Sequence, residues 1–564
     1  MVGGCRLIRR DRGGRGGQSD RAVAASIGSV SSPTRVFATV DRGTASTAVA
    51  LIGRVGGRHR LLGSTGGPVG VPADALLERL RRRILAADRA LAEALGIDQA
   101  GVVADLRRLE CVTTQAPVLA VIAATDRIVG PLAAVAETAG WQVRPLVIDG
   151  AEILQVATAL ADRRVDAILA GASEPPGADE RGLIGELGTL VAAATERRPD
   201  LVTVLAGGLA SPGGRTEALF RPDRPGPTVL APSPADDGGE PLRALLDSLR
   251  GGQDDGRRAL AAAAGSLARV LRRHVEVLEI GQSGGSRTLA SWQPGAEPSV
   301  RTAAVARAAL LPRPFTEADL DDVIGWLPIA LDRLRTRDRL REMASAPWGD
   351  AAADGAALRL AAARAAAGRL LALTPSFDDL PAPDLVIASG GAWLAAPATA
   401  TVLAVADVAR RPGARAVGLD HARVLAPIGT IVDEEERARL VADLRDDLLV
   451  PLGTVVTAAG LRAARTAGTP TVHGVGGPLE IDLVPGSVEL VDVPPGERAT
   501  IELQFRDPVD LGVRARHLAL DVTGGLGGLV VDLRDVPLRL PDRLEPRREL
   551  LASWQALVWP GFDL

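Results

Sequence analysis

Three short glycine-containing segments have the residue types needed to contact a phosphate. The segment at 385–391 reads Leu-Val-Ile-Ala-Ser-Gly-Gly, an apolar run that ends in Gly390 and Gly391 and precedes a stretch of small residues. A strand that ends in two glycines lets backbone approach a ligand without a Cβ in the way. A helix that begins there directs its positive N-terminal end toward the same space. The sequence therefore predicts a strand-turn-helix junction that can face a ligand.

Two earlier segments combine a carboxylate with a glycine. Asp41 is followed by Gly43 and Thr44, and Glu279 is followed by Gly281, each after a β-type run. A carboxylate can anchor Mg²⁺ through water, while backbone N–H groups cradle phosphoryl oxygens. Asp41 also has a simpler interpretation, as a turn residue ahead of a hairpin glycine. The order and spacing of the three segments are those of a two-lobed nucleotide-binding fold, and both interpretations stay open.

Composition restricts the class of protein. The chain has 564 residues, which predicts two to four domains. Apolar residues make up 46% and charged residues 24%, as in globular proteins, and the net charge of −4 gives no general attraction to nucleic acid. Every apolar run is interrupted well before the ~18 residues of a membrane span. We therefore expect a cytoplasmic protein that has neither nucleic acid nor a membrane as its partner.

Residue content excludes several common kinds of site. Lysine is absent from the sequence, which excludes the lysine-containing phosphate loop of many nucleotide-binding proteins. Cys5 and Cys111 cannot form a disulfide framework or a cysteine-rich metal site. None of the five histidines has a second histidine or a cysteine at metal-ligand spacing, so no zinc site is predicted. Asp420 and His421 precede an apolar stretch, where the expected role of Asp420 is to cap a helix.

The pattern of apolar residues divides the chain into four parts. Residues 1–35 are rich in Gly, Arg and Ser and are expected to form a disordered tail. Residues 36–256 form an expected first lobe; within it, strands and helices alternate over 117–208, which favours a parallel sheet covered on both faces. Residues 257–467 are expected to form a second α/β lobe with a helical insertion. Residues 468–564 alternate with period two between Gly and Pro turns, which is typical of a small β domain, here followed by a short tail.

The order of these motifs resembles the actin-like ATPases, a superfamily that includes sugar and acid kinases and chaperone ATPases. The chain is most similar to the MutL family of the glutamate (methylaspartate) mutase system, which is unrelated to the mismatch-repair protein of that name. The resemblance implies a two-lobed, ribonuclease H-like duplicated α/β core with a small C-terminal β domain. It rests on Val-Asp-Arg-Gly-Thr-Ala-Ser-Thr at 40–47, Val-Asp-Ala-Ile-Leu-Ala-Gly at 165–171, Leu-Glu-Ile-Gly at 278–281, the segment at 385–391, and Gly-Gly-Leu-Gly-Gly-Leu-Val-Val-Asp-Leu-Arg at 524–534.

The first motif of that family has the form Asp-x-Gly-Ser-Thr-x-Thr-Lys. Asp41, Gly43 and Thr47 match it, and Thr44 stands in the place of the serine. The resemblance implies that Asp41 holds a metal-bound water and acts in catalysis, while Gly43, Thr44 and Thr47 contact phosphate. The family lysine is replaced by Ala48, which removes a cation from the expected phosphate site.

The second motif departs further from the family form, Asp-Ile-Gly-Gly-Ala-Thr-Thr-Asp. Glu279 replaces the leading acid and is the second catalytic candidate, while Gly281 and Gly284 leave room for phosphate. Arg287 is expected to restore part of the lost positive charge. In the third motif, the resemblance implies that Gly390 and Gly391 pack against adenosine. Trp393 either stacks near the adenosine or fills the interface between helix and sheet.

These features support three hypotheses about function. The resemblance implies an ATP- and Mg²⁺-dependent accessory protein that opens or reloads an adenosylcobalamin-dependent mutase, whose subunits would be its partners. A small-molecule kinase of the same superfamily is the alternative, and it requires a carboxylate base near the transferred phosphate. A scaffold with a degenerate nucleotide site is the third hypothesis, favoured by Ala48 and Gln282.

Overall fold

The computed structural model describes most of the chain from residue 36 onward. The described residues are 36–97, 106–113, 116–211, 219, 225–250, 255–347, 349, 352–374, 376–377, 379–461, 468–474, 477–480 and 484–559. The expected N-terminal tail, residues 1–35, lies outside them. Among the described residues, none of the helices combines the length and the hydropathy needed to cross a bilayer.

The first sheet has four strands in the order β3-β2-β1-β4. Neighbours β1 and β2, and β2 and β3, are antiparallel, whereas β4 returns parallel to β1. Helix α1 packs Leu76, Leu77 and Leu80 against this sheet. The chain breaks after α1 at Asp88, whose carboxylate accepts the N–H of Leu91 and caps a second helix. The elements are β1 (Val36–Arg42), β2 (Ser46–Val55), β3 (Arg58–Pro68), α1 (Ala73–Ala87), α2 (Arg89–Ala94) and β4 (Leu106–Val112).

The second sheet repeats this arrangement and extends it. Its order is β12-β11-β10-β13-β14-β15-β21-β18, with β10–β11 and β11–β12 antiparallel and β10–β13 and β13–β14 parallel. The hairpin pair followed by a parallel strand therefore occurs twice, which is the duplicated, actin-like α/β fold that the sequence predicts. The strands are β10 (Val275–Ile280), β11 (Gly285–Gln293), β12 (Ala296–Val305), β13 (Leu385–Ser389), β14 (Gly413–Leu419), β15 (Val450–Thr457), β18 (Val488–Val491) and β21 (Leu529–Asp532).

Helices cover both faces of the second sheet. Val275 and Val277 of β10 share a core with α7, α12 and α13, whereas Leu278 and Ile280 share another with α10 and α11. Because successive strand residues point to opposite faces, one short apolar run serves both cores. The helices are α7 (Asp255–Leu271), α8 (Glu317–Ile324), α9 (Arg333–Ser345), α10 (Ala353–Leu373), α11 (Ala398–Val408), α12 (Leu425–Gly429) and α13 (Glu434–Asp443).

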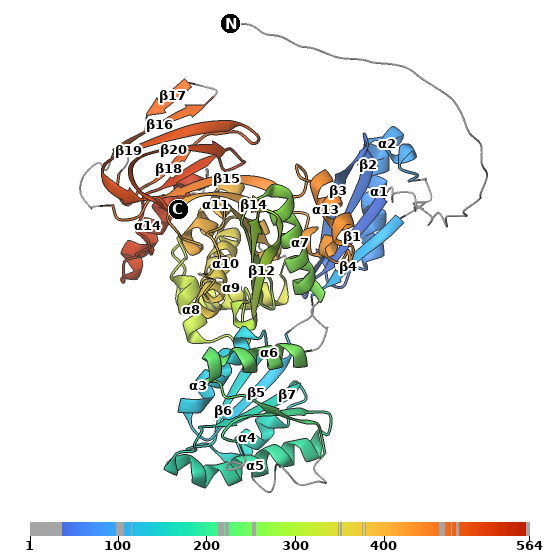
Figure 1. The fold of residues 1–564 in the computed structure, drawn as a ribbon, viewed down its shortest axis with the longest axis vertical. Coiled ribbons are helices and arrows are strands. Elements are labelled where there is room, and N and C mark those ends of the chain that lie inside the picture. Colours follow the sequence, from blue (N-terminus) through green and yellow to red (C-terminus); the bar gives the residue numbers. More distant parts are fainter. Residues whose placement is uncertain are drawn as a thin grey trace, which may run out of the picture. The chain divides into compact units, whose positions relative to one another are not determined.

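A five-stranded sheet is inserted between β4 and α7. All its strands are parallel, in the order β6-β5-β7-β8-β9, which is the flavodoxin-like order. Helices α4 and α5 cover one face and α3 and α6 the other (Figure 1). The range 36–256, expected as one lobe, thus contains two separate sheets. The elements are β5 (Val118–Ala123), α3 (Asp126–Thr138), β6 (Gln142–Val147), α4 (Ile153–Leu160), β7 (Ala167–Ala172), α5 (Ala178–Arg197), β8 (Val202–Gly207), β9 (Thr228–Ala231) and α6 (Glu240–Leu249).

The C-terminal residues divide between two sheets. An antiparallel sheet has the order β17-β16-β19-β20, whereas β18 and β21 join the second sheet (Figure 1). Helix α14 buries Leu551, Trp554 and Val558 in the core of the second sheet, so the tryptophan-containing tail docks on its own chain. The remaining elements are β16 (Gly468–Gly474), β17 (Gly477–Glu480), β19 (Arg498–Asp510), β20 (Arg514–Thr523) and α14 (Leu544–Val558).

Candidate functional site

One cavity collects residues from all three glycine-containing segments. It contains about 930 Å³ of empty space, part of which is open solvent. Eight of the nine predicted site residues line it: Asp41, Gly43, Thr44, Glu279, Gly281, Gly284, Gly390 and Gly391. The exception is Thr47, which lies buried within β2 and does not line this cavity. We call this space the interlobe cavity, because residues of both repeated sheets form its walls.

Two equivalent hairpin turns form one side of the interlobe cavity. The N–H of Gly43 donates to the carbonyl of Ser46 at 2.9 Å, and the N–H of Gly281 donates to the carbonyl of Gly284 at the same distance. Each turn follows the first strand of its sheet, and its residues line the cavity. These bonds use the N–H groups of Gly43 and Gly281 within the turns, so the turns offer a ligand close approach to the backbone of small residues.

The strand that ends in Gly390 and Gly391 packs directly against β10. Gly390 has φ +88°, and a Cβ on it would lie 2.3 Å from the carbonyl oxygen of Ile280. A Cβ on Gly391 would meet nothing within 4 Å. Trp393 is fully buried, and its Nε1 donates to the carbonyl of Leu278 at 3.3 Å, so it fills the interface between helix and sheet. The segment after Gly390 begins as a 3₁₀ turn, Gly391–Ala395, before α11.

The two glycines should respond differently to alanine. We expect Gly390→Ala to destabilise the protein by at least ~1–3 kcal/mol, because a side chain at positive φ is strained and this one meets backbone. Gly391→Ala should leave the free energy of unfolding nearly unchanged, since its new methyl group enters open space. Urea unfolding of both variants measures the difference. Equal stability of the two would contradict the close packing of Gly390.

An arginine from the second sheet's loops reaches the first motif. Arg423, between β14 and α12, pairs its Nε with the Oδ2 of Asp41 at 2.7 Å and donates from Nη1 to the Oγ of Ser46 at 2.7 Å. Both partners of the ion pair are largely buried, with side-chain exposures of 9% for Arg423 and 13% for Asp41. Burial opposes the charge on Arg423, but the carboxylate of Asp41 outweighs it and raises the arginine's pKa. The carboxylate predicted to hold a metal-bound water is therefore paired with a guanidinium.

The cavity has a second buried carboxylate, that of Asp420. Asp420 follows β14 and is buried; its Oδ1 accepts the N–H of Val424 at 3.0 Å, and its Oδ2 accepts the hydroxyl of Ser389 at 3.2 Å. Burial, together with the negative charge of Asp41, raises the pKa of Asp420 to about 7. The prediction that Asp420 caps a helix is wrong: the N-cap of α12 is Val424 and no side chain caps it, because Asp420 lies four residues earlier and bonds the N–H of Val424 itself.

This raised pKa predicts a pH-dependent stability. A carboxyl group whose folded pKa lies above its unfolded value favours the protonated protein, so stability should fall as pH rises from about 4 to about 7. The variant Asp420→Asn keeps an acceptor for the N–H of Val424 and cannot ionise. Relative to wild type, it should become more stable between pH 5 and pH 8 in chemical unfolding. A constant difference between the two proteins over that range would contradict the assignment.

The remaining charges of the cavity come from helices. Arg257 of α7 and Arg359 of α10 line it, and Arg359 donates to the carbonyl of Gly349 at 2.7 Å. Arg287, expected to supply charge here, does not do so. It is buried outside the cavity, where it pairs with Glu276 at 2.7 Å, because its alternating strand position faces away from the turns. Glu279, by contrast, lines the cavity and accepts the hydroxyl of Ser286 at 2.5 Å.

The donor set limits how a metal can bind. Among the described residues, no group of three or more His, Cys, Asp or Glu side chains is placed to hold a metal ion. Mg²⁺ usually keeps several waters and takes only one or two protein carboxylates together with substrate phosphates. Asp41 and Glu279 give the cavity two carboxylates on the two hairpins, and the guanidinium of Arg423 already occupies the Oδ2 of Asp41, so a metal-bound water would have to bind beside that ion pair. The residues therefore suit Mg²⁺ that arrives with a phosphate-bearing ligand.

Comparison with known proteins gives distant structural similarities. Neither the protein-family models nor the curated protein sequences include a match to this chain. Acetone carboxylase, in a nucleotide-free structure, is 13% identical over 79% of this chain and 81% of its own, with a TM-score of 0.23. The (R)-2-hydroxyglutaryl-CoA dehydratase component A of Acidaminococcus fermentans is 8% identical over 72% and 96%, with a TM-score of 0.23. Xylulose kinase of Bifidobacterium adolescentis is 14% identical over 75% and 96%, with a TM-score of 0.24. At these scores the assignment of the fold depends on strand order and direction, which are those of a duplicated actin-like core.

Proposed function

We propose that the chain binds ATP with Mg²⁺ in the interlobe cavity and acts as a nucleotide-regulated accessory protein of the MutL type. Its client would be an adenosylcobalamin-dependent mutase. The observation that carries the nucleotide part is the meeting of three segments, distant in sequence, at one cavity. The two equivalent turns, with identical N–H to carbonyl distances, add support because the two repeats of a duplicated fold present them to one cavity.

Each part of the nucleotide has a partner in this proposal. The turns at Gly43 and Gly281 contact the phosphates, and Arg423 supplies the positive charge that Ala48 cannot. Asp41 and Glu279 hold waters of Mg²⁺, which neutralises the phosphates when bound. Gly391 leaves open space on the third side, where adenosine fits.

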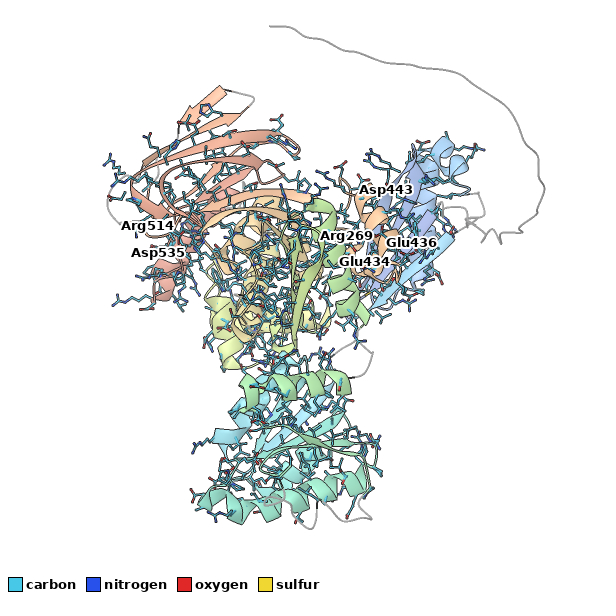
Figure 2. The ribbon with its side chains drawn as sticks, viewed as in Figure 1. Arg269, Glu434, Glu436, Asp443, Arg514 and Asp535 are labelled. Carbon is cyan, nitrogen blue, oxygen red and sulfur yellow. The ribbon has the colours of Figure 1, made fainter. Side chains whose placement is uncertain are left out.

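Polar contacts join the first sheet to α13. Arg107 forms an ion pair with Glu436, and the Nδ1 of His59 lies at hydrogen-bond distance, 2.7 Å, from the Oδ2 of Asp443. Figure 2 shows Glu436 and Asp443 on α13, with Glu434 of the same helix near Arg269, to which it pairs at 3.2 Å. In the proposal, the contacts between the first sheet and α13, together with the Asp41–Arg423 pair, stabilise a closed arrangement, whereas the Arg269–Glu434 pair joins α7 to α13. A nucleotide that binds one arrangement more tightly shifts the population toward it.

A small-molecule kinase remains the alternative function. Asp420 lines the cavity, and its pKa of about 7 suits a general base. Its two oxygens each accept one hydrogen bond, from Val424 and Ser389, and each can accept another. Asp420 is therefore the candidate base for this alternative. A scaffold without nucleotide affinity is the third possibility, and the experiment separates all three.

The test is calorimetric titration with Mg-ATP and Mg-ADP, with Gly391→Val as the blocking variant and Gly70→Val as its control. Both glycines face open space, but only Gly391 lines the cavity. We expect micromolar binding that Gly391→Val abolishes and Gly70→Val retains. No binding by the wild type would establish the scaffold. Turnover stimulated by a small alcohol or acid would favour the kinase, whereas ATP-dependent reactivation of inactivated glutamate mutase would support the accessory role.

A further inference from the structure

A tight turn after β14 holds Arg423 in a strained backbone conformation. The N–H of Arg423 donates to the carbonyl of Asp420 at 3.2 Å, which closes the turn. Arg423 has φ +54°, in the left-handed region that residues with a Cβ rarely adopt. Of the non-glycine residues with positive φ in the described part of the chain, Arg423 is the one that lines the interlobe cavity. Such a conformation persists only where surrounding contacts hold it.

Asp420 supplies the contacts that hold this conformation. Its carbonyl accepts the N–H of Arg423, and its Oδ1 accepts the N–H of Val424 at 3.0 Å. These two N–H groups belong to the peptide planes before and after the Cα of Arg423, so the two bonds together restrict its φ and ψ. Asp420 is 2% exposed, and water therefore does not compete for the bonds.

The end of β13 anchors Asp420 in its place. The N–H of Asp420 donates to the carbonyl of Ala388 at 3.0 Å, and its Oδ2 accepts the hydroxyl of Ser389 at 3.2 Å. Ala388 and Ser389 directly precede Gly390, so the third glycine-containing segment supports the turn. Aspartate suits this position because its two carboxylate oxygens accept from two donors while its backbone makes two further bonds.

The backbone conformation of Arg423 decides where its guanidinium lies. Its Nε lies 2.7 Å from Oδ2 of Asp41, and its Nη1 lies 2.7 Å from Oγ of Ser46. Its Nη2 lies 3.1 Å from the position of a Cβ on Gly43, so all three nitrogens lie at the first turn. In the right-handed region φ would be about −60°, and the side chain would leave the backbone in a different direction.

We propose that Asp420 is a positioning residue for the nucleotide site, which holds Arg423 in the conformation that directs its guanidinium to the first turn. This role rests on the proposed function, because the chain has no lysine and Arg423 is the cation assigned to that turn. Asp420 acts through Arg423 and not by contact with a phosphate. The contacts of Asp420 and Arg423 thereby connect the glycine pair after β13 with the hairpin turn after β1.

The test is calorimetric titration of Asp420→Ala and Asp420→Asn with Mg-ATP. Asp420→Ala removes the bond to Val424 and should weaken binding roughly tenfold, the value of the charge-assisted hydrogen bond that a displaced Arg423 no longer makes. Asp420→Asn keeps an oxygen that accepts the same N–H and should bind as tightly as wild type. The control Asp433→Ala removes a carboxylate that accepts two backbone N–H groups at the start of α13, outside the interlobe cavity, and should leave the affinity unchanged.

Two results of this titration would overturn the proposal. One is wild-type affinity in Asp420→Ala, which would mean that Arg423 keeps its place without the carboxylate. The other is equal weakening in Asp420→Ala and Asp420→Asn, which would mean that Asp420 acts through its charge and not through its hydrogen bonds.

A matched pair of variants at Arg423 tests the turn without altering Asp420. Arg423→Gly and Arg423→Ala both remove the guanidinium, but glycine adopts positive φ without strain. If Asp420 holds the left-handed conformation, Arg423→Gly should unfold at a higher urea concentration than Arg423→Ala. Elsewhere the order is the reverse, because glycine gives the unfolded chain more freedom. An equal or lower midpoint for Arg423→Gly would overturn the proposal, whether or not Asp420→Ala folds.

A stability comparison separates this inference from the proposed function. Asp41→Asn removes the ionic partner of Arg423 and should lower the urea midpoint of the wild type. In the Asp420→Ala background the same change should lower the midpoint much less, because Arg423 no longer contacts Asp41 there. An equal loss in both backgrounds would overturn the positioning role even if Mg-ATP binds. If wild type shows the coupling but does not bind Mg-ATP, the proposed function fails and the placement of Arg423 by Asp420 stands.

Discussion

Replacing Arg423 with alanine should lower the affinity for Mg-ATP by roughly 10- to 100-fold, the value of one charge-assisted hydrogen bond. Arg423 Nη2 lies 3.1 Å from the position that a Cβ would take on Gly43, so the guanidinium borders the first phosphate turn. Its Nη1 also holds the hydroxyl of Ser46, which shares that turn. Since the chain has no lysine, the expected phosphate charge has to come from arginine. Calorimetric titration of wild type and variant measures the loss.

The matched control for this prediction is Arg60→Ala. Arg60 makes two hydrogen bonds to Asp447, at 2.6 and 2.8 Å, but does not line the interlobe cavity. Its loss should leave the affinity for Mg-ATP unchanged. A higher affinity in Arg423→Ala would mean that Arg423 competes with Mg²⁺ for the carboxylate of Asp41. Circular dichroism confirms that the variant is folded, because the ion pair with Asp41 is largely buried.

Replacing Asp532 with alanine should destabilise the protein by about 3–5 kcal/mol, the usual result when one partner of a buried ion pair is removed. Asp532 is fully buried at the end of β21 and pairs with both Arg410 and Arg534. Arg534 also pairs with Asp407 at 2.7 Å, and Asp407 pairs with Arg364 of α10 at 2.7 Å. The variant leaves three buried guanidinium groups and one carboxylate in this network. Arg534 and Arg364 share Asp407, while Arg410 keeps its bonds to backbone carbonyls. Urea unfolding measures the loss.

The same carboxylate predicts how stability changes in acid. Burial alone would raise the pKa of Asp532, but hydrogen bonds from Arg534 and Arg410 outweigh it and lower the pKa to about 2. A folded pKa below the unfolded value stabilises the protein above about pH 4, and this contribution is lost as pH falls from about 4 to about 2. The variant Asp532→Ala should lack that part of the acid sensitivity. As a control, Asp521→Ala removes an exposed carboxylate that accepts the hydroxyl of Thr500, and it should cost ~1 kcal/mol or less.

The buried network explains why β21, a strand of the expected C-terminal β domain, lies in the second sheet. The sequence predicts a β domain from residue 468, since its period-two pattern continues through 529–532. In the structure, β21 is buried along its whole length beside β15, and Arg534 stacks over the ring of Trp554 at 4.4 Å. Strand pattern alone cannot say which sheet a strand joins, because pairing depends on distant residues. The sequence does not reveal that Arg534, just after β21, is buried.

The candidate site was partly predictable for a related reason. A turn such as Gly43 or Gly281 is specified by a few adjacent residues, so local sequence predicts it well. No such local pattern marks Arg423, Asp420 or Arg359 as site residues. They line the cavity because the fold places their loops and helices beside it. Arg287 shows the opposite error, since a residue near a motif in sequence can point to the other face of its strand.

The sequence by itself determined the α/β class, the two acid-glycine turns and the glycine pair after β13, because each depends on neighbours within a few residues. It also determined that any phosphate charge must come from arginine. Only the tertiary structure decided that Arg423 pairs with Asp41, that Gly390 serves close packing while Gly391 faces open space, and that the parallel sheet predicted within 117–208 is separate from the first sheet. The physical reason is that these features arise from contacts between segments hundreds of residues apart, whose geometry depends on the packing of whole sheets.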